Sequence, residues 1–344
     1  MAGNAGNDVQ EITLDKLVPE EFIRQQADYV SSAVGDGIAI NALSGGVDSS
    51  LVTMLGHRAL GERQKTRFID TGLMREDEPR HIVGLFGGLG VEVELVDAQQ
   101  QFFDALRGLT DPEEKRKAFR QTFYKNVFGE LVKGLRAVHP GTTIYLMQGT
   151  NYTDVEETVA GVKTQHNILE QMGIDTKKEF GYALVEPIKM LRKSAIRKVA
   201  EAIGLPAETY ARPPFPGPGL LTRVIGEVPP ESVAVVRAAT AVVEEEIQEE
   251  IEAGHIKPFQ YLAILHNDRV TGMREVEPGK MGRNFGMQIE VRCWDSTDAK
   301  VATPTKLSYE TMSRIEARIR ERLAGVVSVT YNMTPKPPST IEPI

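Results

Sequence analysis

The sequence predicts an α/β protein with a doubly wound, mostly parallel sheet and a smaller C-terminal α+β domain. Over residues 18–203, short apolar runs typical of buried strands alternate with the periodic patterns of amphipathic helices. The string "RPPFPGPGL" at 212–220, rich in proline and glycine, then interrupts this alternation as a rigid connector. Beyond it, a long acidic helix is followed by strand-like runs and one more helix, which is typical of an α+β arrangement.

The expected elements of the first domain follow one another in regular order. The strands are expected at 37–43, 66–70, 91–96, 143–147 and 183–188. The helices are expected at 18–33, 49–61, 76–87, 112–138 and 193–203. Asp111 is the expected N-cap of the fourth helix, because a proline follows it and a glutamate lies three residues later.

The domain limits follow from these patterns. We expect an N-terminal extension over 1–17, a first domain over 18–211, a connector over 212–229 and a second domain over 230–344. In the second domain the expected order is a helix at 230–253, strands at 259–265 and 285–293, a helix at 308–323 and a strand at 326–333. Between 149 and 180 the periodicity is lost, which is typical of a functional segment.

Composition excludes several classes of protein. The net charge of -8 over 344 residues argues against a broad nucleic-acid surface. The sequence contains no window of 18 uncharged apolar residues, so we expect no membrane span. The N-terminus lacks the features of a signal peptide. The single cysteine, Cys293, cannot form a disulfide framework or a paired-cysteine metal site, and we expect it in the core. These features predict a cytoplasmic protein.

The string "SGGVDSS" at 44–50 interrupts a predicted strand and restarts the chain as a helix. In open α/β sheets, ligands bind at the carboxyl ends of the strands, and backbone N–H groups at a helix start suit phosphate. The string lacks the lysine of a Walker A loop. A carboxylate at Asp48 is unusual in a pure anion site and indicates Mg²⁺ beside the phosphates. The alternative is an ordinary strand–helix turn with a capping serine.

The same string resembles the PP-loop of the N-type ATP pyrophosphatases. Seven further strings occur in the order found in the GMP synthetase family, and the resemblance runs from about residue 20 to the C-terminus. They are "FIDTGLMR" (68–75), "DPEEKR" (111–116), "QGTNYTDVEE" (148–157), "VEP" (185–187), "RPPFPGPGL" (212–220), "RVIGEV" (223–228) and "KPPSTIE" (336–342). The chain is similar to family members, known from many archaea, whose ATP-pyrophosphatase is a chain separate from the glutaminase.

This resemblance implies a fold and a reaction. The sheet would be of the adenine-nucleotide α-hydrolase type, and the second domain would form a homodimer. As an ATP-dependent ligase, the protein would adenylylate xanthosine monophosphate (XMP) at its C2 carbonyl oxygen. Ammonia from a separate glutaminase subunit would then displace AMP to give GMP. ATP would be a substrate, Mg²⁺ a cofactor, and neither nucleic acid nor a membrane a partner.

The resemblance also assigns roles to residues. Asp48, Asp154 and Lys163 would be catalytic, with Asp48 holding the metal and Lys163 carried by a lid over about 149–180 that closes over the phosphates. ATP and pyrophosphate would be bound by Ser44, Gly45, Gly46, Val47, Asp48, Ser49, Ser50, Asp70, Thr71, Gly72, Gly149 and Thr150. XMP would be bound by Arg212, Pro216, Gly217, Gly219, Lys336, Thr340, Ile341 and Glu342.

Three alternatives stay open beside this interpretation. The lid strings "VKTQHN" and "ILEQMGID" and the tail end "IEPI" depart from the family pattern. A PP-loop paralogue acting on another nucleotide and a non-catalytic nucleotide-binding regulator would both fit such departures. An enzyme that adds sulfur to tRNA would need a reactive cysteine and a basic surface, and one cysteine with an acidic net charge opposes it.

Overall fold

The computed structural model describes residues 9–159, 182–297 and 299–343, and the chain folds into two compact units. The N-terminal unit comprises Met1–Ile69, Pro79–Asp97 and Phe123–Arg212. The C-terminal unit comprises Asp70–Glu78, Ala98–Thr122 and Pro213–Ile344. The domain limits drawn from chain order had kept 70–78 and 98–122 with the first domain, whereas these two segments pack with the second unit.

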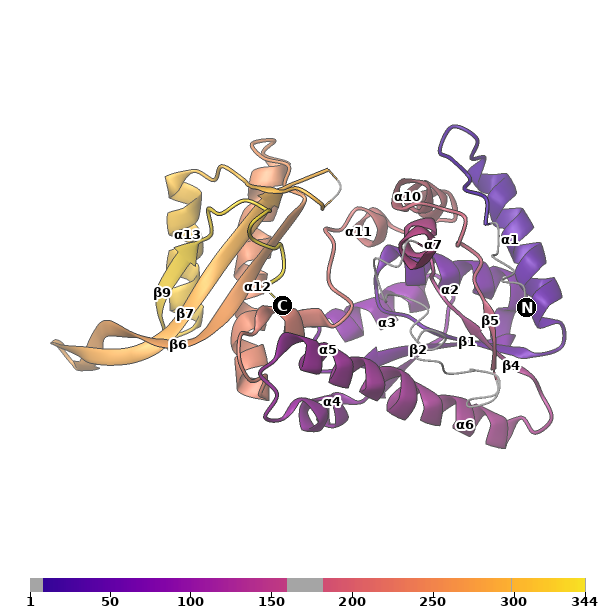
Figure 1. The fold of residues 1–344 in the computed structure, drawn as a ribbon, viewed down its shortest axis with the longest axis horizontal. Helices are drawn as coiled ribbons and strands as arrows, with labels where there is room; N and C mark the ends of the chain where they lie inside the picture. Colours follow the sequence, from indigo (N-terminus) through magenta and orange to yellow (C-terminus); the bar gives the residue numbers. More distant parts are fainter. Residues whose placement is uncertain (1–8, 160–181, 298, 344) are drawn as a thin grey trace. The chain divides into compact units, whose positions relative to one another are not determined.

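The N-terminal unit is built on a five-stranded sheet in the order β3-β2-β1-β4-β5 (Figure 1). Its strands are β1 (Ile38–Ala42), β2 (Gln64–Asp70), β3 (Val93–Asp97), β4 (Ile144–Met147) and β5 (Tyr182–Val185). β1 pairs in parallel with β2 and β4, and β4 pairs in parallel with β5. The predicted doubly wound sheet is therefore confirmed. Its order reverses at β1, where open α/β sheets bind their ligands.

Three helices cover one face of this sheet. They are α1 (Pro19–Val34), α2 (Val47–Leu60) and α10 (Lys193–Ala202), and their apolar faces share one core with β1. Val30, Leu51, Leu55 and Ile196 are fully buried in that core. α6 (Gly129–Val138) lines a groove with β2. α3 (Glu78–Gly88) corresponds to the helix expected at 76–87, whereas the short helix α11 (Ala207–Tyr210) was not predicted (Figure 1).

Some elements differ from the predicted ones. The single helix expected over 112–138 is α5 (Pro112–Gln121), a π-helical turn (Thr122–Phe128) and α6 in succession. The Asp111 N-cap is confirmed, because its side chain accepts hydrogen bonds from the backbone N–H groups of Glu113 and Glu114. The helix α4 (Gln99–Leu106) was not predicted, and α7 (Tyr152–Val159) occupies part of the segment expected to be irregular.

Two cationic side chains, the buried Lys115 and the half-buried Arg237, join the short segments 70–78 and 98–122 to the rest of the C-terminal unit. Lys115 in α5 donates hydrogen bonds to the carbonyl oxygens of Val224 and Gly226, at 2.9 and 3.0 Å. Burial lowers the pKa of Lys115 to about 8, although the nearby Asp111 carboxylate acts in the opposite direction. Arg237 donates to the carbonyl oxygens of Gly72 and Met74. These contacts satisfy backbone groups that apolar packing alone would leave unpaired.

The C-terminal unit is an α+β structure around a long antiparallel hairpin. The α+β class was predicted, but the strands of the hairpin are longer than predicted. The hairpin consists of β6 (Gln260–Glu277) and β7 (Lys280–Asp295), both longer than predicted because most of the side chains described in their distal halves are exposed and form no continuous apolar run. β8 (Thr303–Pro304) and β9 (Val326–Tyr331) also pair with β7. The long helices α12 (Pro230–Glu252) and α13 (Tyr309–Arg322) complete the unit.

Alternate residues of β7 serve two different faces. Val291 faces α13 together with residues of β9. Trp294 lies on the opposite face and packs in a cluster with Ile341 of the C-terminal tail (residues 336–343). Cys293 is buried in the core as predicted, and burial raises the pKa of its thiol to about 12. No helix in the described ranges is long and apolar enough to cross a membrane.

Candidate functional site

The string "SGGVDSS" forms a tight turn after β1, at residues 44–46, and the first turn of α2, which begins at Val47. Gly45 has a φ of 77°, a left-handed conformation that favours glycine. The hydroxyl groups of Ser44 and Ser49 lie 2.9 Å apart, and the Ser49 hydroxyl donates to the Gly46 carbonyl at 3.0 Å. Within the described chain, no side chain caps the first turn of α2. The loop therefore presents uncapped N–H groups at a helix start, which is the arrangement that binds phosphate.

Asp48 lies in the first turn of α2, and its two carboxylate oxygens have different surroundings. Oδ2 accepts hydrogen bonds from Lys193 Nζ and from Asn151 Nδ2, the latter at 3.3 Å. Oδ1 is buried and has no hydrogen-bond partner among the described residues. A buried carboxylate oxygen without a donor is costly unless a ligand or cation completes it. Asp48 is therefore the residue of this loop best placed to hold a cation.

A divalent cation fits this single carboxylate. The described residues contain no group of three or more histidine, cysteine, aspartate or glutamate side chains that could enclose a metal. Mg²⁺ does not need such a cage, because it is commonly held by one or two carboxylates together with substrate phosphates. The donor set around Asp48 therefore suits a metal that arrives with a nucleotide.

The end of β4 lies against the same loop. A Cβ atom on Gly149 would be 3.1 Å from Asp48 Cβ and 3.3 Å from the Ser49 backbone nitrogen. Glycine therefore suits this close approach, because any side chain here would require its neighbours to shift by a few tenths of an ångström. The Thr150 hydroxyl donates to Glu186 Oε1 at 2.5 Å. The structure thus brings Gly149 to the loop, as the resemblance implied, and orients Thr150 through a neighbour on the segment after β5.

Asp154 has a local structural role in addition to its predicted one. Its Oδ2 accepts a hydrogen bond from the Asn151 backbone N–H at 3.0 Å, and its own N–H donates to Asn151 Oδ1 at 3.3 Å. This reciprocal pair is a capping box at the start of α7. The catalytic role of Asp154 stays a prediction. Lys163 lies outside the described residues.

Two residues at this site were missed by the sequence analysis. Lys193 begins α10 and its ammonium group contacts the Asp48 carboxylate. Asn151 lies in the quoted string 148–157 but was given no role, although its side chain also reaches Asp48. Their positions could have indicated a role at the site, because each residue follows a strand of the parallel sheet, and ligands bind at the carboxyl ends of such strands.

Asp70, Thr71 and Gly72 form a turn in the C-terminal unit. Asp70 accepts hydrogen bonds from the Gly72 backbone N–H and from Gln99 Nε2, both at 2.9 Å. The Thr71 hydroxyl accepts from the Leu73 N–H at 3.2 Å. Gly72 has a φ of 73°, and a Cβ there would meet the Phe103 ring at 2.7 Å. Their predicted role at the nucleotide stays a prediction.

The proline–glycine connector makes a second tight turn. The Gly219 N–H donates to the Pro216 carbonyl at 2.8 Å, and the Leu220 N–H donates to the Leu73 carbonyl at 2.7 Å. Gly219 has a φ of 65° and is buried, whereas Gly217 in the same turn is exposed. Arg212 is half-buried and is the last residue of the N-terminal unit.

The C-terminal tail is a fixed part of its unit. The Glu342 carboxylate accepts hydrogen bonds from Thr222 Oγ1 at 3.1 Å and from Gln260 Nε2 at 2.8 Å, and it forms an ion pair with Arg223. Lys336 Nζ donates to the Ala299 carbonyl at 2.7 Å. Ile341 is buried, and the Thr340 hydroxyl donates to the Glu342 carbonyl. The four predicted tail residues therefore lie in an ordered segment.

Two arginines that the sequence analysis left without a role surround Phe215 of the connector. The guanidinium carbons of Arg75 and Arg223 lie 4.0 and 4.8 Å from the centre of its ring. Arg75 also donates to Glu244 Oε1 at 2.6 Å. Arg223 is fully buried, and its Nη1 has no partner among the described residues. Both arginines lie in strings quoted for the resemblance, but the strings did not show that the two side chains meet at Phe215.

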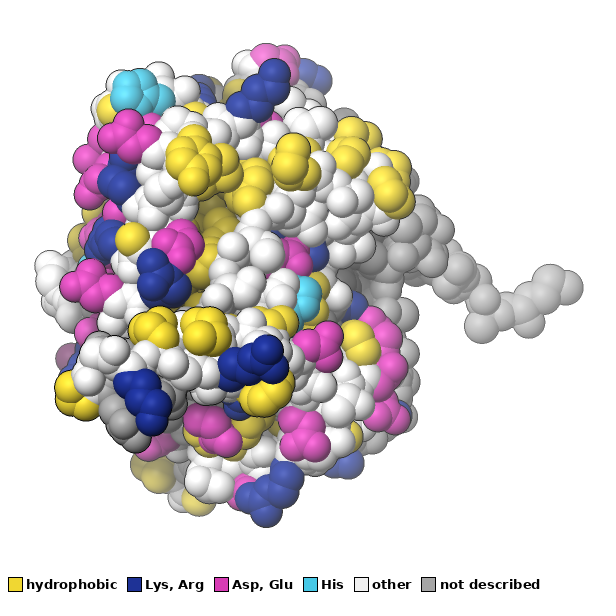
Figure 2. Space-filling model, turned by 90° about the vertical axis from the view of Figure 1, so that its left-hand side faces the viewer, with side chains coloured by type: hydrophobic (Ala, Val, Ile, Leu, Met, Phe, Trp, Pro, Cys, Tyr) yellow, Lys and Arg dark blue, Asp and Glu magenta, His cyan; other side chains and the backbone are white. Residues whose placement is uncertain are grey.

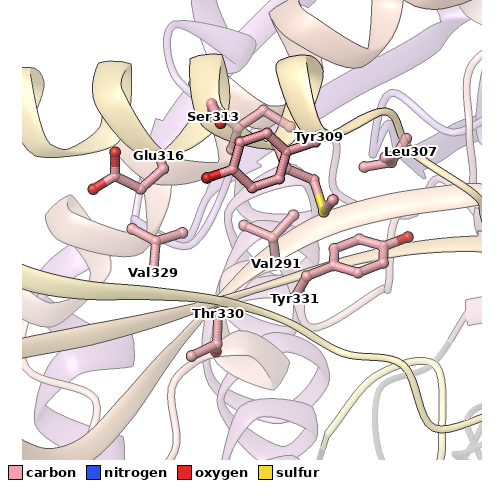
Figure 3. A pocket seen from close by; sticks show the side chains of 10 residues that line it. Val291, Leu307, Tyr309, Ser313, Glu316, Val329, Thr330 and Tyr331 are labelled. Carbon is pink, nitrogen blue, oxygen red and sulfur yellow. The ribbon is translucent and has the colours of Figure 1, made fainter.

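A cavity elsewhere in the C-terminal unit contains none of these residues. It has a volume of about 310 Å³ and lies between α13 and the adjoining strands β7 and β9 (Figure 3). Its lining is mostly apolar, and the Tyr331 hydroxyl already donates to the carbonyls of Thr305 and Cys293. None of the predicted site residues lines it, so it is not the candidate site.

Comparison with known proteins links both units to described families. Residues 19–217 match the family described as NAD synthase, and residues 245–343 match the family described as GMP synthase C terminal domain. A solved NH3-dependent NAD synthetase from Campylobacter jejuni is 19% identical, with a TM-score of 0.43, and the match covers 57% of this chain and 77% of that protein.

Whole-chain relatives are closer in sequence. Proteins named as one of the subunits of glutamine-hydrolyzing GMP synthase are 42% identical in Archaeoglobus fulgidus, 43% in Methanocella arvoryzae and 41% in Thermococcus kodakarensis. The three matches cover 93–94% of this chain and 97–99% of the relatives.

Proposed function

This chain belongs to the same family as these GMP synthase subunits, and from this premise we propose that it converts XMP to GMP with ATP and ammonia. The observation that carries the proposal is the glycine–serine loop at the carboxyl end of β1, with a half-satisfied Asp48 carboxylate beside it. Such a loop suits a pyrophosphate and its counter-ion. The enzyme is then an ATP-dependent ligase that releases AMP and pyrophosphate.

The reaction takes place in two steps. The C2 carbonyl oxygen of XMP attacks the α-phosphorus of ATP, and the bond from that phosphorus to the bridging oxygen of pyrophosphate breaks. Ammonia then adds at C2, loses a proton, and expels AMP together with the former carbonyl oxygen. This order converts a poor leaving group into a good one. The contribution of the protein is to position the reactants and to stabilise the departing charges.

The loop residues divide this work in the N-terminal unit. The N–H groups of Val47 to Ser49 at the start of α2 and the Ser44 and Ser49 hydroxyls bind the departing pyrophosphate. Asp48, whose Oδ1 has no hydrogen-bond partner among the described residues, would hold Mg²⁺, which would supply neutralisation of charge on the phosphates. Thr150 and Asp154 follow β4 in the same segment as Gly149 and Asn151, which approach Asp48. Lys163 would supply a further cation from the lid.

The residues proposed to bind XMP belong to the C-terminal unit, except for Arg212, which is the last residue of the N-terminal unit. Lys336 is suited to a phosphate, because only one of its three donor hydrogens is used, on Ala299, among the described contacts. Thr340 and Glu342 offer hydrogen-bonding groups for the sugar or base. The backbone of the turn at Pro216 and the exposed Gly217 offers a surface that a flat nucleotide can approach closely, and the buried Gly219 keeps the turn in shape.

The ammonia is proposed to come from a separate glutaminase chain in the cytoplasm. The relatives are named as one subunit of a glutamine-hydrolyzing enzyme, which implies a second subunit. The lone buried thiol of Cys293 does not suit a persulfide carrier, so sulfur transfer to tRNA has no support in the site.

The proposal is tested by mixing the protein with ATP, Mg²⁺, ammonium and XMP, and measuring AMP and GMP. GMP and AMP formed in equal amounts, and only when XMP is present, are the expected result. AMP formed with a different acceptor nucleotide instead would identify a paralogue. ATP binding without turnover, measured by calorimetry, would favour a regulatory role.

A homodimer is proposed through the exposed face of the β6–β7 hairpin. Met273, Met281 and Phe285 are 58–70% exposed and share one face of the hairpin, because Met273 is opposite Arg283 and the strand period is two. The other face is occupied near Gly272 and Gly286 by Val327. Figure 2 shows hydrophobic side chains exposed in several groups on one side of the molecule. Exposed apolar groups of this kind are typical of association surfaces.

Replacing Phe285 by Glu is expected to convert the dimer into a monomer, because a carboxylate at the interface would be buried without a partner. Sedimentation equilibrium measures the change in mass. Val138→Glu is the matched control, since Val138 is equally exposed, at 72%, but lies on α6 of the other unit. A wild-type monomer, or an unchanged dimer of the Phe285 variant, would contradict this interface.

A further inference from the structure

Arg292 in β7 holds the C-terminal tail by its backbone. Its Nη1 donates to the carbonyl oxygens of Thr340 and Ile341, at 2.6 and 3.1 Å. The arginine is buried, so these two hydrogen bonds are made away from bulk water. Hydrogen bonds from a charged donor are stronger than those between neutral groups. Arg292 therefore fixes the tail backbone at Thr340 and Ile341, the two residues that precede Glu342.

Glu290 keeps the guanidinium of Arg292 in place. Its Oε1 accepts from Arg292 Nε at 2.5 Å and from Asn332 Nδ2 at 2.8 Å, and its Oε2 contacts His266 Nε2 at 2.7 Å. Burial by itself raises the pKa of Glu290, but the hydrogen bonds from Arg292 and Asn332 bring that pKa below its ordinary value. The carboxylate is thus charged at neutral pH, and a buried charge pair of this kind has a defined geometry.

The alternation of β7 puts this pair on the face that the tail covers. Glu290, Arg292 and Trp294 share one side of the strand, and Trp294 packs in a cluster with Ile341. At its other end the tail is held by paired backbone hydrogen bonds between Ala302 and Lys336. Arg292 is therefore a second anchor, placed next to the residue whose carboxylate reaches Thr222 and Gln260.

We propose that Arg292 is a positioning residue for XMP recognition, acting through the tail backbone and supported by Glu290. The inference rests on the proposed function, in which Thr340 and Glu342 contact XMP. The planar guanidinium directs Nε to the carboxylate and Nη1 to two carbonyls at once, which the single ammonium group of a lysine does not reproduce. Arg292 does not contact the reacting atoms in this account.

The kinetic test compares Arg292→Gln with Arg314→Gln. Arg314 is a suitable control because it also pairs with two glutamates, Glu246 and Glu250, but lies on α13. We expect the KM for XMP to rise about tenfold in the Arg292 variant, because two charge-assisted hydrogen bonds to the tail are lost. The KM for ATP is expected to stay unchanged. The control is expected to leave both KM values unchanged. Equal effects on the two substrates, or on the two variants, would overturn the proposal.

A truncated chain ending at Ser339 separates an effect through the tail from a direct one. If Arg292 acts through the tail, adding Arg292→Gln to the truncated chain is expected to leave its KM for XMP unchanged. A further rise of similar size in the double variant would mean that Arg292 acts elsewhere, and would overturn the proposal. Arg292→Lys serves the same comparison if the glutamine variant does not fold.

Hydrogen exchange of the tail amides tests the positioning without any substrate. In Arg292→Gln the amides of 339–342 are expected to exchange at least about tenfold faster, while those of β7 and β9 keep their protection. Unchanged exchange in the tail, or equal loss across the unit, would contradict a positioning role. If the wild type makes no GMP, the proposed function fails, but this measurement still decides whether Arg292 anchors the tail.

Discussion

Replacing Asp48 by Asn is expected to lower XMP-dependent AMP formation by at least about 100-fold. Asparagine keeps the size of the side chain and an oxygen acceptor, but it removes the negative charge that attracts a metal bound to pyrophosphate. The buried Oδ1 of Asp48 has no donor in the described structure, so this oxygen can bind a cation although Oδ2 contacts Lys193. Initial rates of AMP release at increasing Mg²⁺ measure both the loss and any change in metal requirement.

Lys193→Gln is the matched control for this prediction. It removes the ammonium group from Asp48 but leaves the carboxylate in place. Because Lys193 is more than half exposed, its ion pair contributes little to stability, and the melting temperature should stay near the wild-type value. The rate loss is expected to be smaller than in Asp48→Asn. Wild-type AMP release from Asp48→Asn would remove Asp48 from the mechanism.

Replacing Gly219 by Ala is expected to destabilise the C-terminal unit by about 3 kcal/mol, from left-handed backbone strain and a steric clash together. Gly219 has a φ of 65°, and a Cβ there would lie 2.2 Å from the Leu73 carbonyl oxygen. That oxygen accepts the hydrogen bond from the Leu220 N–H, so it cannot move away without breaking this bond. Thermal unfolding measures the stability, and the KM for XMP measures the effect on the proposed site.

Gly217→Ala in the same turn provides the control. A Cβ on Gly217 would meet no heavy atom within 4 Å, so this variant is expected to unfold at the wild-type temperature. If both alanine variants behaved alike, the clash at Leu73 would not be the reason why glycine is needed at 219.

Local pattern was sufficient for the sheet and for the ligand loop. All five strands of the sheet were predicted: the buried strands from their apolar runs, and the edge strand β3 from the alternation of apolar and polar residues over 91–96. The Asp111 cap was predictable because all its partners lie within three residues. The helix α7 was missed although its Asn151–Asp154 capping box is visible in the sequence, because the polar residues around it hide the helical period.

The hairpin and the short segments show where local pattern was insufficient. The distal halves of β6 and β7 carry no alternating apolar signal, since one face is exposed and the other contains glycines. The segments 70–78 and 98–122 pack with the C-terminal unit through Arg237 and Lys115, whose carbonyl partners lie more than a hundred residues away. Nothing in the sequence near a cation tells which distant carbonyl it will satisfy.

The sequence by itself determined the fold class, the loop at Ser44–Ser50 and the family, since these depend on periodicity and on contiguous strings. Only the tertiary structure decided the partners of Asp48, which come from positions 103 and 145 residues away. It also decided the support of the tail by Arg292 and Glu290. The physical reason is that a buried charge must find its partner in space, and the order of the strands, not of the chain, sets which side chains meet.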